Sequence, residues 1–261
     1  MPRFTDAEPF LAERDPDPVL FHGPERTGQP FLLVCDHAGN AVPARLGTLG
    51  LDPELLTRHI GIDVGAWAHA TALADRLDVP AIGQLYSRLV IDCNRRLDAP
   101  DSIALSSDGI DIPANRHVGA AEANARWREI MLPYQATIAQ HLARMPRQTC
   151  IVAMHTCTPS LQGGQFRPWH VGVIADRDQR IAEAVIEHLA GRDTSLVVGH
   201  NEPYRINPVT DYTLPIHAEG GQRPYVEFEL RNDLFTTPEE RSHVIGLLAD
   251  ALKFAMERLV S

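Results

Sequence analysis

The stretch Phe31-Leu-Leu-Val-Cys-Asp-His-Ala-Gly-Asn40 decides how this chain can fold. Residues 31–35 form an apolar run that predicts a buried strand, and the run stops abruptly at Asp36 and His37. Gly39 then loosens the backbone for a turn. In an α/β protein, such a strand delivers its terminal polar groups to the carboxyl edge of the sheet, where ligands bind. A polar turn with a surface histidine is the alternative interpretation, and a second copy of the pattern argues for a site.

That second copy is the apolar run 149–154, which also ends in a histidine, His155. The remaining pattern alternates strands with helices. Further strands are predicted over 80–86, 89–92, 170–175, 195–199 and 225–230, and helices over 64–77, 120–143 with a kink or break at Pro133, 180–189 and 238–259. This order predicts an α/β fold over 1–261: a single three-layer domain with a mixed, mostly parallel central sheet and helices on both faces.

Two segments depart from the regular alternation. Residues 1–30 are rich in Pro, Asp and Glu and predict an irregular leader with a short strand at 19–21. Residues 100–119 form a long polar loop, and such loops inside compact domains are usually functional or mobile. We interpret this loop as a flap over the site, with an inert surface excursion as the alternative.

Composition narrows the class of protein. The chain has 261 residues, of which 44% are hydrophobic and 22% charged, as is usual for a globular protein. No apolar run approaches the ~20 residues that cross a bilayer, and the first residues lack the layout of a secretory signal. Four cysteines in apolar surroundings favour reduced thiols in the cytoplasm. The net charge of −10 argues against a nucleic-acid or acidic-membrane partner.

The two strand-end histidines, His37 and His155, can converge at one edge of the sheet. Neutral imidazole is the commonest metal ligand, and catalytic zinc typically has three protein ligands and one open position. A carboxylate would complete the set, and Asp63 and Asp36 are the nearest candidates. The structural alternative for Asp63 is that it caps the helix predicted to start at residue 64.

Hydrolysis at such a site also needs a group that accepts a proton from water. Glu227 and Glu229 lie on one face of the last predicted strand, in surroundings that would raise a carboxyl pKa. Each could instead face solvent or pair with Arg231. We favour Glu229 as the base. Cys157 as a thiolate nucleophile is the competing mechanism.

The arginines near residue 90 could bind an anionic substrate, because a guanidinium group matches a carboxylate with two hydrogen bonds. Arg88, Arg95 and Arg96 would supply a local basic pocket in an acidic protein. A solvated turn is the alternative interpretation for the pair at 95 and 96.

Several blocks together resemble the N-formylglutamate amidohydrolase family, in order from about residue 30 to the end. They are Asp36-His-Ala-Gly-Asn40, Asp63 with Gly65-Ala66, Ser87-Arg-Leu-Val-Ile-Asp-Cys-Asn-Arg95, His155-Thr156, Asn201-Glu-Pro-Tyr204, His217 and Glu227-Phe-Glu-Leu-Arg-Asn-Asp233. The resemblance implies the fold of zinc-dependent carboxypeptidases and aspartoacylase. The Ser87–Arg95 and Glu229–Leu234 blocks are its most specific parts.

The resemblance also implies roles for particular residues. His37 and His155 look like the two metal-binding histidines of that superfamily. The glutamate of its His-x-x-Glu motif falls at Asn40, a departure that leaves Asp63, Asn40 and Asp36 as candidates for the third ligand. Asn94 and Arg95 look like its carboxylate-binding pair, and Glu229 like its catalytic glutamate. The pocket would then be completed by Tyr204 and His217.

The sequence therefore predicts a cytoplasmic, zinc-dependent amidohydrolase with one zinc ion per chain, a monomer or small homo-oligomer. The substrate implied by the resemblance is N-formyl-L-glutamate, split into formate and glutamate in histidine degradation. Another N-acyl amino acid or a small peptide is the alternative substrate. A non-catalytic anion-binding protein on the same fold is the alternative from another class.

Overall fold

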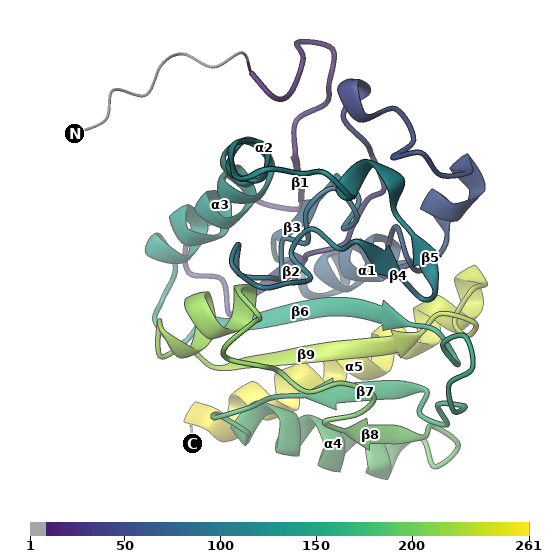
Figure 1. The fold of residues 1–261 in the computed structure, drawn as a ribbon. Coiled ribbons are helices and arrows are strands. Elements are labelled where there is room, and N and C mark those ends of the chain that lie inside the picture. The colour runs from purple at the N-terminus through teal and green to yellow at the C-terminus, as the bar shows by residue number, and fades with distance from the viewer. Residues whose placement is uncertain (1–8, 261) are drawn as a thin grey trace.

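The protein is described by a computed structural model, which defines residues 9–260. Seven strands form the main sheet in the order β1-β3-β2-β6-β9-β7-β8 (Figure 1). Their bounds are β1 Val19–His22, β2 Phe31–Cys35, β3 Ala81–Gln84, β6 Cys150–Cys157, β7 Val171–Ile174, β8 Val198–His200 and β9 Tyr225–Arg231. The pairs β2·β3, β2·β6, β6·β9 and β7·β8 are parallel, whereas β1·β3 and β7·β9 are antiparallel. The prediction of a mixed, mostly parallel sheet is confirmed.

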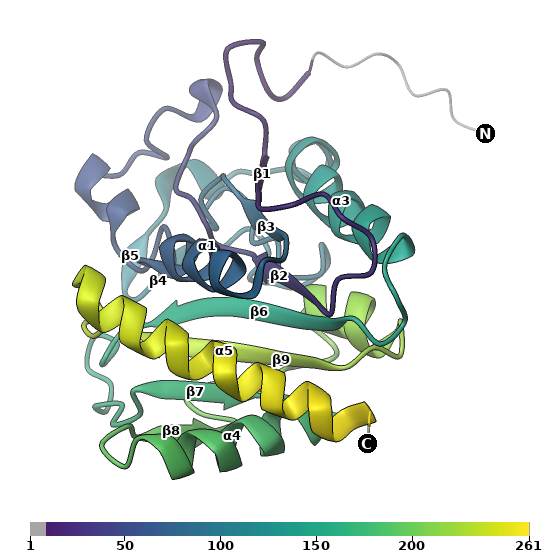
Figure 2. The same ribbon diagram turned by 180° about the vertical axis from the view of Figure 1, so that it is seen from behind.

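Helices cover both faces of this sheet. The first group, α1 (Ala66–Leu77), α4 (Arg180–Arg192) and α5 (Pro238–Val260), packs together on one face. In Figure 1 α1 and α5 pass behind the strands, and in Figure 2, seen from the opposite side, they lie in front. The other group is a long helix in three parts: α2 (Ala120–Arg126), the π-helical turn η4 (Trp127–Met131) and α3 (Leu132–Ala143), which packs on β1 and β3.

The π-helical turn lies where Pro133 was expected to kink or break the predicted helix 120–143. Pro133 lacks a backbone N–H, and the wider hydrogen-bond spacing of a π turn lets the helix continue without that donor. The chain therefore stays helical through the proline but changes its winding just before it.

Short elements complete the chain. The 3-10 turns are η1 (Ala44–Leu46), η2 (Pro53–Thr57) and η3 (Pro113–Asn115), a second π-helical turn is η5 (Leu214–Glu219), and β4 (Ser106–Ser107) pairs with β5 (Ile110–Asp111) in a small hairpin. Part of the expected leader is ordered, because β1 is an edge strand of the main sheet; residues 1–8 of that segment lie outside the described residues. None of the helices in the described part of the chain has the length and hydropathy that a membrane span requires.

One prediction of a strand is wrong. Residues 89–92 form turns rather than an extended strand, although Leu89, Val90 and Ile91 are buried. The carbonyl groups there find side chains instead of a neighbouring strand: Asn115 Nδ2 donates to Leu89 O, and Arg126 Nη1 donates to Val90 O. Because both donors are buried, they satisfy the backbone of a turn inside the core.

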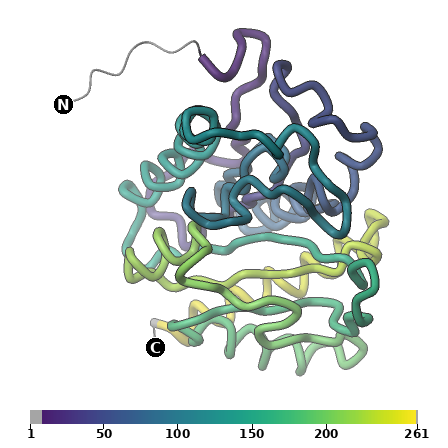
Figure 3. The backbone as a smooth tube through the Cα atoms, viewed as in Figure 1, coloured from purple at the N-terminus to yellow at the C-terminus, as the bar shows by residue number. Residues whose placement is uncertain are grey.

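The two halves of the chain meet at the centre of the sheet. Figure 3 shows the purple-to-teal first half in the upper part of the molecule and the green-to-yellow second half in the lower part. The junction is the parallel pair β2·β6, with Phe31 opposite Cys150 and Leu33 opposite Val152. The carboxyl ends of these two strands carry the two histidines singled out in the sequence.

Candidate metal centre and active-site pocket

The sheet brings three strand ends to one place. His37 follows β2, His155 lies near the end of the adjacent strand β6, and Glu229 lies opposite His155 on β9. The strand β6 is longer than predicted and continues to Cys157, so His155 is held within the ladder. Because the pairs are parallel and in register, these side chains must leave the sheet at the same edge.

Asp63 joins them from the turn that precedes α1. The turn depends on Gly65, whose φ of +84° lies in the left-handed region that favours glycine. A second close approach follows β2, where a Cβ on Gly39 would lie 2.1 Å from Leu85 O. These two glycines let the loops after β2 and before α1 close over the end of the sheet.

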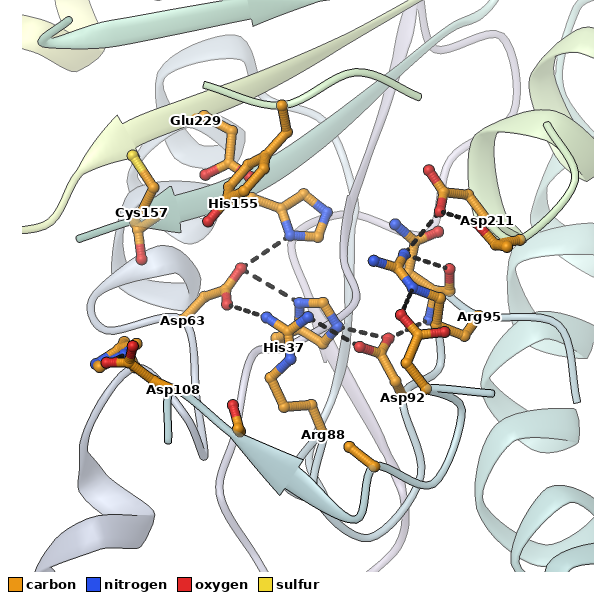
Figure 4. A pocket seen from close by; sticks show the side chains of 18 of the residues that line it. His37, Asp63, Arg88, Asp92, Arg95, Asp108, His155, Cys157, Asp211 and Glu229 are labelled. Carbon is orange, nitrogen blue, oxygen red and sulfur yellow. Dashed lines mark hydrogen bonds and ion pairs between the residues drawn. The ribbon is translucent and has the colours of Figure 1, made fainter. Parts of the chain in front are cut away.

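His37, Asp63 and His155 form a buried cluster whose ligand atoms all lie within 4.8 Å of one another. His155 Nδ1 lies 2.8 Å from Asp63 Oδ2, and His37 Nδ1 lies 3.3 Å from the same oxygen. Figure 4 shows Asp63 between the two imidazole rings. Two histidine nitrogens and one carboxylate oxygen therefore converge on one small volume, which is a donor set that suits zinc.

The other nitrogen of each histidine contacts a second carboxylate. His37 Nε2 lies 2.8 Å from Asp92 Oδ1, and His155 Nε2 lies 3.3 Å from Asp36 Oδ2. Metal-binding histidines nearly always present their outer nitrogen to a carboxylate, a carbonyl or water, because this fixes the ring and its tautomer. The arrangement of both rings thus matches that of metal ligands.

These contacts shift the ionisation of the whole cluster. Burial opposes ionisation of Asp92, but the charges of His37 and Arg88 outweigh it and hold the pKa of Asp92 well below its usual range. The pKa of Asp36 is likewise lowered, because its contact with His155 outweighs burial. Burial disfavours the charged form of His155, but Asp36 and Asp63 raise its pKa well above the ordinary value. A metal ion held by His37 and His155 would compete with protons for their nitrogens.

The geometry distinguishes the three candidates for the third ligand. Asn40 donates from Nδ2 to Leu56 O at 3.1 Å, and Asp36 contacts the outer nitrogen of His155 rather than the inner one. The capping alternative for Asp63 is wrong, because Gly65 is the N-cap of α1 and no side chain caps that helix. Asp63 alone of these three shares the cluster with both histidines.

Glu229 and Glu227 are both buried, as a base inside a dry site must be. Glu229 Oε2 has no hydrogen-bond partner among the described residues. Burial raises the pKa of Glu229 to about 8 and that of Glu227 to about 7. The solvent-facing alternative is therefore wrong for both glutamates. Arg231 instead pairs with Asp233 through Nε at 2.7 Å.

Cys157 lines the same pocket, two residues beyond His155 on the same strand. Burial raises the pKa of its thiol to about 12, so the group remains protonated near neutral pH. A thiol is a poor nucleophile compared with a thiolate. The structure therefore gives no support to the cysteine-based mechanism.

A cavity of about 770 Å³ opens over the cluster, within the range of clefts that bind small molecules. Its walls include His37, Asp63, His155, Glu227 and Glu229 at the base and, from the loop 100–119, Pro100, Asp101, Ala104 and Ser106–Asp108. Residues 100–108 of that loop therefore form part of the cavity wall, and the role of the loop as a flap stays a prediction. Asp108 fastens its tip, with one oxygen 2.9 Å from His59 Nε2 and the other accepting from Gln162 N at 2.8 Å.

Among the predicted anion-binding residues, Arg88 and Arg95 line this cavity, but both already contact carboxylates. Arg88 donates to Asp63 at 3.1 Å and to Asp92 at 2.9 Å. Arg95 donates to Asp101 at 2.9 Å and to Asp211 at 2.7 Å. Arg88 thus holds Asp63 of the candidate metal cluster and its neighbour Asp92 in place. Arg95 can bind an anion only if the anion shares or replaces one of its carboxylate partners.

Two further groups in the wall can bind an anion. Arg205 also lines the cavity and pairs with no carboxylate in the described part of the chain. Asn94 also lines the cavity, and its side-chain oxygen accepts from Thr213 N at 3.1 Å. Arg96 pairs with Asp98 at 3.8 Å and is not among the residues that line the cavity.

Tyr204 and His217 have different surroundings. Tyr204 lines the cavity, and its hydroxyl accepts a 2.8 Å hydrogen bond from Arg167. His217 lies on η5 outside the cavity wall, and its Nε2 is 2.7 Å from Gln135 Oε1. Burial lowers the pKa of His217 to about 4, so this ring is neutral near pH 7. Its place is behind the site rather than in the pocket.

Sequence reasoning missed several residues of this site. Asp92 lies inside the block Ser87–Arg95, where its position between two arginines and beside a strand-like run was a usable signal. Asp211, Arg205 and Thr213 lie in an irregular segment with no local pattern to identify them. Asp211 and Thr213 are placed by contacts with residues more than 100 positions away.

Comparison with known proteins gives consistent results. A model of the N-formylglutamate amidohydrolase family matches residues 29–236. None of the curated proteins matches the sequence. Among solved structures, a gene product of Agrobacterium tumefaciens is 31% identical with a TM-score of 0.89, and the match covers 97% of this chain and 100% of that one.

A second solved structure is similar in fold. It is the N-formylglutamate amidohydrolase of Ralstonia eutropha JMP134, at 21% identity and a TM-score of 0.68, with 93% of this chain and 97% of that chain covered. The family match spans both strand-end histidines, Asp63 and the two glutamates of β9. The chain belongs to the N-formylglutamate amidohydrolase family.

Proposed function

We propose that this protein is a zinc-dependent amidohydrolase that hydrolyses N-formyl-L-glutamate to formate and L-glutamate. The observation that carries the proposal is the buried cluster of His37 Nδ1, His155 Nδ1 and Asp63 Oδ2, with the unpartnered Glu229 Oε2 on the neighbouring strand. Three protein ligands beside a pocket leave an open position, which is typical of catalytic rather than structural zinc.

The donor set fits the ion. Its ligands are two imidazoles and one carboxylate, each buried, and the outer nitrogen of both rings contacts a carboxylate. A bound zinc ion would polarise the acyl carbonyl and lower the pKa of a water molecule to about 7. The expected content is one zinc ion per chain.

The chain's own residues then divide the remaining work. Glu229 accepts a proton from the attacking water and delivers it to the amine nitrogen as the amide C–N bond breaks. Burial suits Glu229 to this role, because its pKa of about 8 lies near the working pH. Glu227 lies two residues before Glu229 on the same face of β9. It would assist Glu229 by keeping the base of the pocket polar.

Substrate binding falls to the wall of the cavity. The amide group of Asn94, the guanidinium groups of Arg95 and Arg205, and the partly exposed Tyr204 all line it. A substrate with two carboxylates matches this wall, because guanidinium groups recognise carboxylates specifically. The size of the cavity also admits larger N-acyl amino acids or a small peptide, which remain the alternative substrates.

The test combines metal analysis with an assay of formate release from N-formyl-L-glutamate, before and after chelation. We expect close to one zinc per chain, loss of activity on chelation, and recovery when zinc is restored. His155→Ala should lose both the metal and the activity. His22→Ala is the matched control, because His22 also pairs with a carboxylate, Asp75, but lies outside the cavity.

Each other outcome has a definite meaning. Stoichiometric zinc without formate release would keep the metal site and replace the substrate by another N-acyl amino acid. Unchanged activity in a protein free of metal would overturn the zinc mechanism. Zinc that binds but serves no reaction with any N-acyl amino acid would favour a non-catalytic anion-binding protein.

A further inference from the structure

A row of polar side chains runs behind the metal centre from His217 to His155. His217 Nε2 lies 2.7 Å from Gln135 Oε1, and Gln135 Nε2 lies 2.9 Å from Thr213 Oγ1. Thr213 Oγ1 in turn lies 2.6 Å from Asp36 Oδ1, and Asp36 Oδ2 lies 3.3 Å from His155 Nε2. Gln135, Thr213, Asp36 and His155 are all buried, so water does not compete for these contacts.

The direction of this row is set at Gln135. Its Nε2 also donates to the backbone carbonyl of Cys93 at 2.7 Å, and a carbonyl can only accept. The atom that contacts Cys93 and Thr213 must therefore be the amide nitrogen, and the amide oxygen must face His217. His217 then donates from Nε2, as a neutral ring with its proton on that atom can.

Thr213 passes the same direction onward. Its hydroxyl accepts from Gln135, and the single hydroxyl proton is then donated to Asp36 Oδ1. Asp36 is a carboxylate, so its second oxygen can only accept from His155. Asp36 Oδ2 and His155 Nε2 form an ion pair at 3.3 Å, and neither atom has a hydrogen-bond partner in residues 9–260. Because an ionised carboxylate attracts a protonated nitrogen and repels a lone pair, this ion pair favours a proton on His155 Nε2.

We propose that Thr213 and Gln135 are positioning residues that act through Asp36 to hold His155 with Nε2 protonated and the Nδ1 lone pair directed at the metal. The inference rests on the metal site of the proposed function and deepens it. It also gives the predicted substrate residue His217 a different role, as the outer end of this row. The Nδ1 atom so presented is the one that faces Asp63 and His37.

The row also connects the metal centre to the wall of the pocket. Thr213 N donates to Asn94 Oδ1 at 3.1 Å, and Asp211, two residues earlier, accepts from Arg95 at 2.7 Å. The backbone of Thr213 thus contacts the anion-binding wall, while its side chain contacts Asp36. Thr213 is therefore placed to fix the position of His155 relative to the cavity wall that carries Asn94 and Arg95.

The experiment measures zinc affinity by competition with a chelator, independently of activity. Thr213→Val keeps the shape of the side chain and removes its donor. We expect it to weaken zinc binding by about 10-fold, the lower end of the usual effect of losing the direct outer partner of a metal-bound histidine, because Thr213 acts on His155 only through Asp36. Thr213→Ser keeps the hydroxyl and should restore the affinity to within a fewfold of wild type. Gln135→Met should give a smaller loss than Thr213→Val.

Thr149→Val is the matched control. Thr149 is equally buried and donates to Gln29 O at 2.7 Å, at the opposite end of the strand that carries His155. It should leave the zinc affinity unchanged. Thermal unfolding of the metal-free variants shows which of them fold, and Gln135→Met provides the test if Thr213→Val does not.

The outcomes separate this inference from the proposed function. Wild-type affinity in Thr213→Val, or an equal loss in Thr149→Val, would overturn the inference alone. A wild-type protein that binds no zinc would overturn the metal site and the inference with it. Nitrogen NMR of the zinc-loaded protein gives a second readout, since His155 should keep a hydrogen-bonded proton on Nε2 in the wild type and in Thr213→Ser.

Discussion

In the candidate metal centre each histidine contacts a carboxylate through its outer nitrogen, but different groups hold the two carboxylates in place. His37 and His155 both direct Nδ1 at Asp63, and each contacts a carboxylate through Nε2, Asp92 on one side and Asp36 on the other. The two carboxylates differ in what holds them. Asp92 accepts a hydrogen bond from the charged guanidinium group of Arg88, whereas Asp36 accepts one from the neutral hydroxyl group of Thr213.

The surroundings explain the difference. The side chain of Arg88 is 28% exposed at the wall of the cavity, where a charge keeps contact with water. Thr213 is fully buried, and a further charge at its position would lose its hydration with no solvent nearby. Close to the pocket the protein can hold a carboxylate by charge, whereas in the core it uses neutral hydrogen bonds.

The comparison first predicts which carboxylate takes part in proton transfer. The pKa values of Asp36 and Asp92 are lowered, so both stay ionised, whereas the pKa of Glu229 is raised to about 8. Glu229→Gln should reduce kcat by about 10²- to 10⁴-fold without loss of zinc, because a general base contributes roughly that much. Glu227→Gln is the comparison variant and should lose less.

The pH dependence sharpens the same prediction. Activity requires the ionised carboxylate, so kcat/KM should rise with pH along an acidic limb centred at or below about 8, since a bound cation lowers the pKa of Glu229. Glu229→Gln should lose that limb. Comparable kinetics in Glu229→Gln, or an unaltered limb, would move the base to another residue.

The next effect concerns the charged side. Arg88→Gln leaves Asp92 and Asp63 without their guanidinium partner, and we expect it to lower the free energy of unfolding of the metal-free protein by about 3 kcal/mol. Thr213→Val, on the neutral side, should cost about 1–2 kcal/mol. Urea unfolding of both variants checks the order.

An exposed ion pair provides the control for this measurement. Arg116 pairs with Asp111 at 2.7 Å, with both side chains more than half exposed, so Arg116→Gln should change stability by less than about 1 kcal/mol. If Arg88→Gln lowers the free energy of unfolding no more than Arg116→Gln does, the contacts of Arg88 with Asp63 and Asp92 do not stabilise the fold.

The smallest expected effect concerns His217, at the outer end of the neutral side. Its pKa is about 4 in the folded protein, below the ordinary value of 6.5. Between these values the unfolded chain binds a proton that the folded chain does not, so the stability due to His217 is lost as the pH falls from about 6.5 to about 4. His217→Gln should remove on the order of 1 kcal/mol of that loss.

The measurement compares urea unfolding of wild type and His217→Gln at pH 7 and pH 4.5. The difference between the two proteins isolates the contribution of His217 from the other titrating groups. An equal loss of stability in both proteins would show that His217 is not held neutral by the fold.

Much of the architecture was predictable because its signals are local. The apolar run 31–35 and the alternation over 225–230 identified strands to within one residue, and the helix expected over 64–77 is α1, Ala66–Leu77. The strand predicted from the apolar run 89–92 is wrong for a physical reason. Burial alone does not distinguish a strand from a turn whose carbonyls are bound by buried side chains such as Asn115 and Arg126.

The chemistry of the site was predictable in part. His37, His155 and Glu229 could be assigned because each lies at or near the end of an apolar strand, and parallel strands bring such ends together. The third ligand could not be chosen among Asp36, Asn40 and Asp63, since their side-chain directions depend on two loops. His217 was assigned to the pocket, and the fold places it behind the centre.

The sequence by itself determined the α/β class, the two strand-end histidines and the glutamates of the last strand, because hydrophobic patterning acts over a few neighbouring residues. Only the tertiary structure decided that Asp63 completes the cluster, that Arg95 already has carboxylate partners, and that Thr213 stands behind His155. Those relationships join residues far apart in the chain. They exist only once the sheet order has placed the loops against one another.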